Sequence, residues 1–403
     1  MPLTNSAQCA TRHAVILVAG ESRRTRPLTL HRPKPLIPLV GRPLLAHILD
    51  ELVGLVTHVT LVVGYRAADI QAHFGADYRG MELRYVPQQQ VNGTASALQA
   101  VAGRIDAPFF LLYGDNLISR VDLENICRER YSMAALRVAD PQAFGILDIV
   151  DDRVQRIIEK PPHAKPGAPA NPGIYHFDAA VFPLLERIRP SPRGEYELTD
   201  LIALLAAEHP VHYHLCAGHW VPVGTPWEAL IANAFLLEQQ ADRPAVQHPA
   251  ATIAATSMLN GAVAVGQARI GAGSRITGPA VIGDDVVIGA NTVIERSVLA
   301  AGVTVGDNCV IDNTMLGAGT VVAADCLVQH SLLDTGARLG TATRLPSRIF
   351  TDVQSTAQVG DRLDPEVLCR RGAVLGPGVT LPAGSSVEIR VNVPSVVTVA
   401  IST

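Results

Sequence analysis

Residues 17–38 read LVAGESRRTRPLTLHRPKPLIP, and the rest of the chain is organised around this stretch. It starts as an apolar strand that breaks at Ala19-Gly20. The loop that follows holds four arginines, one lysine and one glutamate, a local charge of +4 in a chain whose formal net charge is −4. Four prolines remove backbone donors and fix φ, which excludes one long helix. A stiff, basic loop directly after a buried strand favours a polyphosphate ligand.

Length and composition exclude several classes of protein. The 403 residues suffice for two domains, and they are 48% hydrophobic but only 4% aromatic. A core of Ala, Val, Leu and Ile is typical of parallel sheets and β-solenoids. The negative net charge disfavours a nucleic-acid binder. No stretch reaches the ~18–20 apolar residues that would span a bilayer, and the N-terminus lacks an apolar signal region. We therefore expect a cytoplasmic protein that binds neither nucleic acid nor membrane.

Strands and helices alternate through the first half of the chain. Near-continuous apolar strands separated by helical spacing predict a doubly wound parallel sheet, whose ligands bind at the carboxyl ends of the strands. Gly20, Gln88 and Asp115 all fall at such ends. Strands are expected at 14–18, 59–63, 81–88, 109–116 and 211–224, and helices at 44–55, 67–74, 93–105 and 226–240.

The second half of the chain is a repeat. Isoleucine recurs at every sixth position, which is the hexapeptide pattern of a left-handed parallel β-helix. A 17-residue period overlays it in residues 293–309, 310–326 and 327–343. Cys309 and Cys326 share one repeat position, so we interpret them as packed small residues. The pattern fades over 344–370, which we interpret as an inserted loop. The recurring isoleucines are Ile270, Ile276, Ile282, Ile288 and Ile294.

The basic loop resembles the signature of the sugar-1-phosphate nucleotidylyltransferases (NDP-sugar pyrophosphorylases), in which a G-x-G-T-R-x-R-P-L-T run is followed by R-P-K-P. The 17-residue repeat resembles the C-terminal domains attached to these enzymes. The resemblance implies an α/β fold with a Rossmann-like nucleotidyltransferase domain and mixed sheet over 11–240, a linker at 241–250, and a left-handed β-helix over 251–403. It also implies the reaction sugar 1-phosphate + NTP → NDP-sugar + pyrophosphate, with Mg²⁺.

The resemblance assigns three residues to catalysis. Arg24 aligns with the arginine that grips the triphosphate, and Lys34 with the lysine that contacts the α-phosphate region. Asp115 ends an apolar strand in Gly-Asp-Asn, where a carboxylate suits Mg²⁺. Only three of the 33 basic residues are lysine, and Lys34 and Lys160 both lie in motifs of this kind.

Further residues are assigned to the nucleotide and the sugar phosphate. Ala19 and Gly20 let the backbone approach the nucleotide. Gln88, Gly93 and Thr94 match a Q-x4-G-T run that reads the base and leans toward uridine or thymidine. The sugar-phosphate residues implied in the same way are Gly145, Glu159, Lys160 and Asn171.

Two positions depart from the family pattern. Ser22 replaces a glycine, which strains the backbone if φ is positive there. Pro222 replaces an aspartate that would be the second metal ligand. An alternative to the enzyme is therefore a non-catalytic regulatory subunit that binds a sugar nucleotide. A further alternative is a bifunctional enzyme with His330 as an acyltransferase base in the β-helix. Association of copies through the β-helix is also expected.

Overall fold

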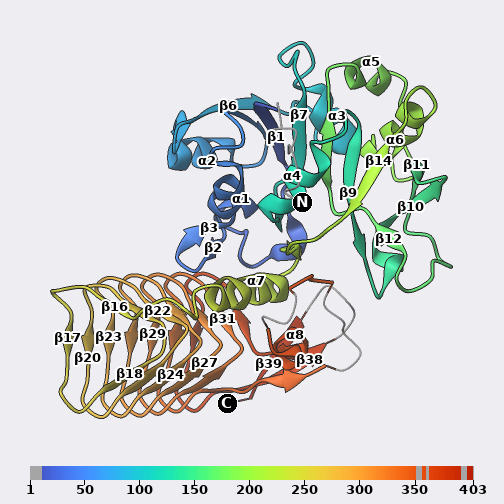
Figure 1. The fold of residues 1–403 in the computed structure, drawn as a ribbon. Coiled ribbons are helices and arrows are strands. Elements are labelled where there is room, and N and C mark those ends of the chain that lie inside the picture. Colours follow the sequence, from blue (N-terminus) through green and yellow to red (C-terminus); the bar gives the residue numbers. More distant parts are fainter. Residues whose placement is uncertain (1–10, 351–355, 360–362, 392–396, 403) are drawn as a thin grey trace, which may run out of the picture.

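The computed structural model describes residues 11–350, 356–359, 363–391 and 397–402. It contains a mixed α/β sheet domain followed by a parallel β-helix, with helix α7 (Pro226–Glu238) lying between the two (Figure 1). Within these residues, none of the helices is long and apolar enough to cross a membrane.

The sheet has the strand order β11-β10-β12-β9-β13-β7-β1-β4-β6-β5, and β14 pairs with β9. Its strands are β1 (His13–Val18), β4 (His58–Val63), β5 (Asp77–Tyr78), β6 (Met81–Pro87), β7 (Phe109–Tyr113), β9 (Ser132–Arg137), β10 (Gly145–Val150), β11 (Arg153–Glu159), β12 (Pro169–Ala170), β13 (Ile174–Phe177) and β14 (His212–Leu215). The short pairs beside it are β2 (Pro38–Leu39) with β3 (Arg42–Pro43) and β8 (Asn116–Leu117) with β15 (Val221–Pro222).

Helices cover both faces of this sheet because side chains along a strand alternate between faces. Ile16 and Val18 of β1 join one apolar core, and Val15 joins the other. The first core holds α1 (Leu44–Leu52), α2 (Ala67–Phe74), α4 (Arg120–Ile126) and α7; the second holds α3 (Thr94–Gln99), α5 (Val181–Leu185) and α6 (Leu198–Ala206). Short 3-10 turns are η1 (Arg23–Thr25), η2 (Lys34–Leu36) and η3 (Pro141–Ala143).

The parallel strands end at one edge. Val18 pairs with Val63, Val63 pairs with Pro87, and Leu17 pairs with Tyr113. The loops that leave β1, β6 and β7 therefore meet, and the predicted site residues follow each of these strands directly.

Several predicted elements were wrong in extent. The strand predicted over 109–116 ends at Tyr113, and Asn116 already belongs to β8 in another sheet. The helix predicted over 93–105 ends at Gln99, and turns continue to Gly103, where φ is +71°. The single strand predicted over 211–224 is two strands in different sheets, β14 and β15. Between them the Asp122 carboxylate accepts bonds from the backbone N–H of Ala217 (2.7 Å) and Gly218 (3.3 Å), which turns the chain.

The β-helix is built from three parallel sheets, one strand of each per coil. The first holds β16 (Val246–Gln247), β19 (Val263–Val265), β22 (Ala280–Ile282), β25 (Val298–Leu299), β28 (Met315–Leu316), β31 (Leu332–Leu333) and β36 (Val374–Leu375). The second holds β17 (Thr252–Ile253), β20 (Arg269–Ile270), β23 (Val287–Ile288), β26 (Thr304–Val305), β29 (Val321–Val322), β32 (Arg338–Leu339) and β37 (Thr380–Leu381). The third holds β18 (Met258–Asn260), β21 (Arg275–Thr277), β24 (Val293–Glu295), β27 (Val310–Asp312), β30 (Leu327–Gln329), β33 (Arg344–Leu345) and β38 (Ser386–Val391). After the last coil, β39 (Val397–Ser402) pairs with β38 in the antiparallel direction.

The repeat positions read from the sequence stack inside the coils. All five recurring isoleucines are at most 3% exposed, and Cys309 and Cys326 pack in the same core at 0% and 1%. Their interpretation as packed small residues is confirmed. The 17-residue register is also observed, since Val293 pairs with Val310 and Val310 with Leu327.

The coils begin earlier than the sequence indicated, and the described residues of the interruption include regular elements. Strand β16 lies inside the stretch predicted as a linker, because Val246 pairs with Ala264 of the next coil. After β33 the chain leaves the coil through β34 (Arg348–Ile349), α8 (Pro365–Cys369) and β35 (Arg370–Arg371). Leu332 consequently pairs with Val374, which lies 42 residues later in the chain. In the preceding coil, Met315 pairs with Leu332, only 17 residues later.

Candidate functional site

The loop after β1 is held in a tight, left-handed turn. Ser22 has φ +54° and ψ +54°, as a residue in a glycine position would. Its carbonyl accepts hydrogen bonds from the Oγ1 atoms of Thr25 (2.7 Å) and Thr29 (3.0 Å), both of which are buried. These two hydroxyls stabilise a conformation that is unfavourable for a side chain of this kind.

The arginines of this loop do not all face the same part of the molecule. Arg23 and Arg26 both bind Glu21. Arg32 reaches the β-helix instead, where its Nη2 lies 2.6 Å from Oδ1 of Asp334. Arg24 is exposed and faces Gly224, at which a Cβ would lie 3.7 Å from the guanidinium.

Lys34 and Asp115 form the charged centre of the site. The Lys34 ammonium lies 2.9 Å from Oδ2 of Asp115, and Lys34 is buried whereas the Asp115 side chain is 40% exposed. The 3-10 turn η2 sets Lys34 beneath the loop, because the prolines on both sides limit its backbone. Lys34 thus offers a fixed positive charge, and Asp115 keeps a second oxygen open toward solvent.

The base-reading segment lies at the opposite wall. The Gln88 amide donates to the Gly93 carbonyl (3.1 Å) and to Oγ of Ser96 (2.8 Å). Gly93 has φ +129°, and a Cβ on it would lie 2.2 Å from the Tyr196 carbonyl oxygen. Oγ1 of Thr94 accepts the Leu198 backbone N–H at 3.0 Å. This segment therefore requires glycine and is pinned to the start of α6.

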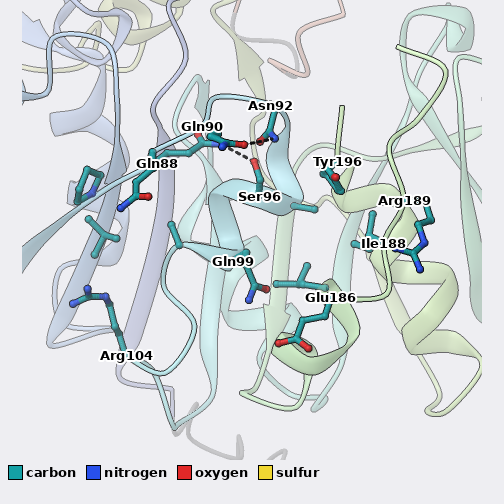
Figure 2. A pocket seen from close by; sticks show the side chains of 16 residues that line it. Gln88, Gln90, Asn92, Ser96, Gln99, Arg104, Glu186, Ile188, Arg189 and Tyr196 are labelled. Carbon is teal, nitrogen blue, oxygen red and sulfur yellow. Dashed lines mark hydrogen bonds between the residues drawn. The ribbon is translucent and has the colours of Figure 1, made fainter. Parts of the chain in front are cut away.

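One cavity of about 370 Å³ joins these pieces. Seven of the predicted residues line it: Ala19, Gly20, Lys34, Gln88, Gly93, Thr94 and Asp115. A larger hollow of about 600 Å³ lies beyond Gln88, between α3 and α5 (Figure 2). That hollow is lined mainly by amide and apolar side chains and lacks Lys34 and Asp115, so the smaller cavity is the better candidate for phosphate chemistry.

The predicted sugar-phosphate residues form a second cluster. Glu159 pairs across the strands with Gly145, where a Cβ would lie 2.7 Å from Ile157 and 3.1 Å from the Glu159 carboxylate. Asn171 donates its backbone N–H to the Gly145 carbonyl at 2.9 Å. Lys160 has φ +47° and its ammonium lies 4.0 Å from Glu159. None of the four lines the smaller cavity.

Two tyrosines connect the clusters. Tyr113 lines the cavity, and its hydroxyl lies 3.5 Å from that of Tyr175, which accepts a 2.6 Å bond from the Asn171 amide. Burial raises the pKa of both hydroxyls, so both stay protonated near neutral pH. The negative charges of Asp115 and Glu159 both add to the rise in the pKa of Tyr113, so this hydroxyl interacts electrostatically with both clusters.

Sequence reasoning missed several residues of this region. Arg193 contacts Glu159 at 3.4 Å and Glu197 at 2.8 Å, and Glu195 lines the cavity. Glu228 is half-buried, and its Oε2 accepts the Gly224 N–H at 2.8 Å. Burial raises the pKa of Glu228, and the charges of Lys34 and Arg24 act against that rise. Glu228 lies in the first turn of α7, where the sequence predicted only a helix.

The residues present fit a magnesium ion with one protein carboxylate. Asp115 has an oxygen free of Lys34, and Mg²⁺ is commonly bound by one or two carboxylates together with substrate phosphates. Pro222 pairs with Asn116, and the Val223 N–H donates to the Asp115 carbonyl at 2.9 Å, so Pro222 stands next to Asp115. Across the described ranges, no cluster of three or more His, Cys, Asp or Glu could hold a metal alone.

Comparisons with known proteins cover both halves of the chain. Residues 13–239 match the nucleotidyl transferase family, and residues 259–354 match the GMPPB C-terminal domain. The bifunctional protein GlmU of Methanocaldococcus jannaschii is 37% identical over 227 residues, 56% of this chain and 54% of that protein. This chain thus spans about half the length of that relative.

Two other relatives are covered more fully. The UTP–glucose-1-phosphate uridylyltransferase AglF of Haloferax volcanii is 35% identical over 48% of this chain and 82% of that protein. The mannose-1-phosphate guanylyltransferase of Mycobacterium tuberculosis is 32% identical over 63% of this chain and 75% of that protein. A solved structure of a putative glucose-1-phosphate thymidylyltransferase from Bacillus anthracis matches with TM-score 0.51 and 27% identity, over 56% of this chain and 94% of that one.

Proposed function

We propose that this chain, which belongs to the nucleotidyl transferase family, transfers a nucleotidyl group from an NTP to a sugar 1-phosphate and releases pyrophosphate. The observation that carries the proposal is the buried Lys34 beside the half-exposed Asp115, in a cavity whose other wall is the Gln88–Thr94 segment. UTP and dTTP are the favoured nucleotides, because Gln88 and Gly93 are the residues that the family uses to read a pyrimidine.

The proposed chemistry depends on position and charge. A phosphate oxygen of the sugar phosphate attacks the α-phosphorus, and the bond to the pyrophosphate breaks. Lys34 neutralises charge at the α-phosphate, and Arg24 stabilises the departing pyrophosphate. Asp115 would hold Mg²⁺, which when bound neutralises the nucleotide phosphates. Glu159 orients sugar hydroxyls, and Lys160 binds the sugar phosphate beside Gly145 and Asn171.

A pyrophosphate-release screen tests this proposal. The full chain is incubated with each of UTP, dTTP, GTP, CTP and ATP and with a panel of hexose 1-phosphates, in Mg²⁺ and in Mn²⁺. We expect release for at least one pair, with UTP or dTTP fastest. Absence of release from every pair would contradict the proposed activity.

A specific observation favours a second candidate, a nucleotide-sugar-binding subunit without turnover. Pro222 stands beside Asp115, where the family pattern has a second carboxylate. The variant Pro222→Asp separates the two candidates. An enzyme with one metal carboxylate should gain activity at limiting Mg²⁺, whereas a subunit that has lost other catalytic features should bind an NDP-sugar calorimetrically yet remain inactive after the substitution.

We also propose that copies of the chain associate through the β-helix. The long parallel coils offer an extended, regular surface for such contacts (Figure 1). Sedimentation velocity measures the masses of the full chain and of a chain that ends after α7. We expect the full chain to sediment as an oligomer. A full chain that stays monomeric at micromolar concentrations would contradict this part of the proposal.

A further inference from the structure

A separate cavity of about 520 Å³ lies where three parts of the chain meet. Helix α7 forms one wall, one corner of the β-helix forms the second, and the inserted segment around α8 forms the third. Its volume suits a small molecule. It shares no residue with the proposed nucleotide cavity. Its polar lining residues are Glu238, Arg296, Asp312, Asn313, Gln329, His330, Ser347, Asp364, Glu366 and Arg370.

Two buried nitrogen atoms in this cavity have no hydrogen-bond partner within the described residues. They are Nδ2 of Asn313 and Nδ1 of His330, on side chains that are 2% and 5% exposed. A buried donor without an acceptor is unfavourable, so a ligand oxygen that accepts from it would stabilise the site. Both residues occupy the same corner of successive coils, with φ of +44° and +47°. Their backbones are therefore about 4.8 Å apart, close enough for one ligand to reach both.

The charges of the walls limit the kind of ligand. Four carboxylates and two guanidinium groups line the cavity, so its net charge is negative. Both arginines already have acidic partners, since Arg296 binds Asp312 at 2.7 Å and Arg370 binds Glu366 at 2.6 Å. A phosphate would meet uncompensated carboxylates here and is disfavoured.

The imidazole of His330 is uncharged at neutral pH. Burial lowers the pKa of His330 to about 4, although Asp312 acts in the opposite direction. Arg370 and Arg296 lower it further, and Glu366 raises it. A neutral ring donates through one nitrogen and accepts through the other. The cavity thus combines donors and acceptors, a mixture that matches hydroxyl groups.

We propose that this cavity binds a polyhydroxyl molecule without phosphate, namely a free monosaccharide or amino sugar. Asn313 donates to a hydroxyl oxygen, His330 exchanges a hydrogen bond with a neighbouring hydroxyl, and the carboxylates accept from others. Glu238 of α7 closes the cavity from the side of the sheet domain. A bound sugar therefore contacts α7, the β-helix corner and α8 at once.

Isothermal titration of the full chain with glucose, mannose, galactose and glucosamine tests this site. Each sugar is compared with its phosphorylated form and with inorganic phosphate. We expect saturable binding of at least one free sugar, weakened at least tenfold by Asn313→Gly. The matched control is Asn308→Gly, because Asn308 has a similar φ of +56° but is exposed at another corner. Glycine tolerates both positions, and folding is checked by circular dichroism.

Two further variants show whether a change in sugar binding arises in this cavity. Glu238→Gln, on the opposite wall, should also weaken binding, even if Asn313→Gly is poorly folded. Lys34→Met, which alters the nucleotide cavity, should leave free-sugar binding intact. Absence of binding by all free sugars would overturn the proposal. So would binding that is lost in Lys34→Met but kept in Asn313→Gly, since the sugar would then occupy the nucleotide site.

Discussion

At the scale of single residues, the chemistry of the site depends on which charged side chains are buried and which can contact a ligand. Lys34 is almost fully covered, yet its ammonium reaches a carboxylate that faces the cavity. Arg23 and Arg26 share Glu21 at the surface, so one carboxylate compensates part of their combined charge. The chemistry thus depends on Lys34 and on the exposed Arg24 more than on the total charge of the loop.

Replacing the buried lysine should abolish most of the activity. We expect Lys34→Met to lower kcat by about 10²–10³-fold, as the loss of one preorganised charge does in other enzymes. The measurement is pyrophosphate release with the best substrate pair from the screen. Lys165→Met is the matched control, because Lys165 is an exposed lysine outside the site. Equal activity of the two variants would exclude the proposed role of Lys34.

The half-buried carboxyl of Glu228 predicts a pH-dependent stability difference. Burial raises the pKa of Glu228 above 4.5 in the folded protein, so the folded state binds more protons than the unfolded state just above that pH. Stability then falls as the pH rises from 4.5 to the folded pKa and levels off above it. Glu228→Gln cannot lose this proton. Its free energy of unfolding relative to the natural protein should therefore increase over this window.

Urea denaturation of both proteins from pH 4.5 to pH 8 measures this difference. The glutamine retains an oxygen that accepts the Gly224 N–H, which makes it the conservative choice. A difference that does not change with pH, or that declines as the pH rises, would show that the carboxyl charge is well compensated in the folded state.

At the scale of elements, the segment between β6 and α3 illustrates how a loop is shaped for a ligand. Gly93 is required for the fold itself, because its φ is +129° and the Tyr196 backbone leaves no room for a Cβ. Gly20 differs, since a Cβ there meets no protein atom within 4 Å. Gly93 therefore has a structural role at one wall of the cavity, whereas Gly20 leaves room for a ligand at the other wall.

This contrast gives a paired prediction. Gly93→Ala should lower the free energy of unfolding by at least about 2 kcal/mol, through backbone strain and the clash with Tyr196. Gly20→Ala should leave stability within about 0.5 kcal/mol but raise KM for the NTP, because its methyl group enters the cavity. Urea midpoints and NTP titrations of the rate measure the two effects. A destabilised Gly20→Ala protein with unchanged KM would contradict the assignment.

At the scale of the whole molecule, the β-helix is attached directly to elements of the site. Arg32 of the basic loop binds Asp334, and Gly376 of the β-helix lies against Pro27. The inserted segment also reaches the sheet domain, where Gln358 exchanges two backbone hydrogen bonds with Trp220, at 2.7 and 3.0 Å. Trp220 immediately precedes β15, the neighbour of Asp115. The second domain therefore supports two edges of the proposed site.

Breaking the buried interdomain ion pair should destabilise the protein. In Arg32→Leu, Asp334 would remain a buried charge, 3% exposed, with no arginine beside it. We expect a loss of about 3 kcal/mol. The control Arg23→Leu removes an exposed pair of the same loop, in which the arginine is 78% exposed, and should cost less than about 1 kcal/mol. Thermal and urea unfolding compare the variants, and equal losses would disprove the supporting role of Arg32.

The sequence by itself determined the two-domain architecture and the strand ends that carry the site. Buried β1, β4 and β7 read as apolar runs, because strands covered on both faces select for aliphatic residues along their whole length. The six-residue and 17-residue periods determined the β-helix, since each coil repeats the same inward positions. Gly20, Gln88 and Asp115 could be placed at one edge because parallel strands end together.

Only the tertiary structure decided which charges are free and what joins the two domains. Arg32 and Asp334 are 302 residues apart in the sequence, so no local pattern pairs them. The same holds for Gln358 with Trp220, and for the α7–α8 cavity, whose walls come from three separate parts of the chain. Local spacing encodes strands, turns and repeats, whereas contacts between distant segments depend on how the finished elements pack.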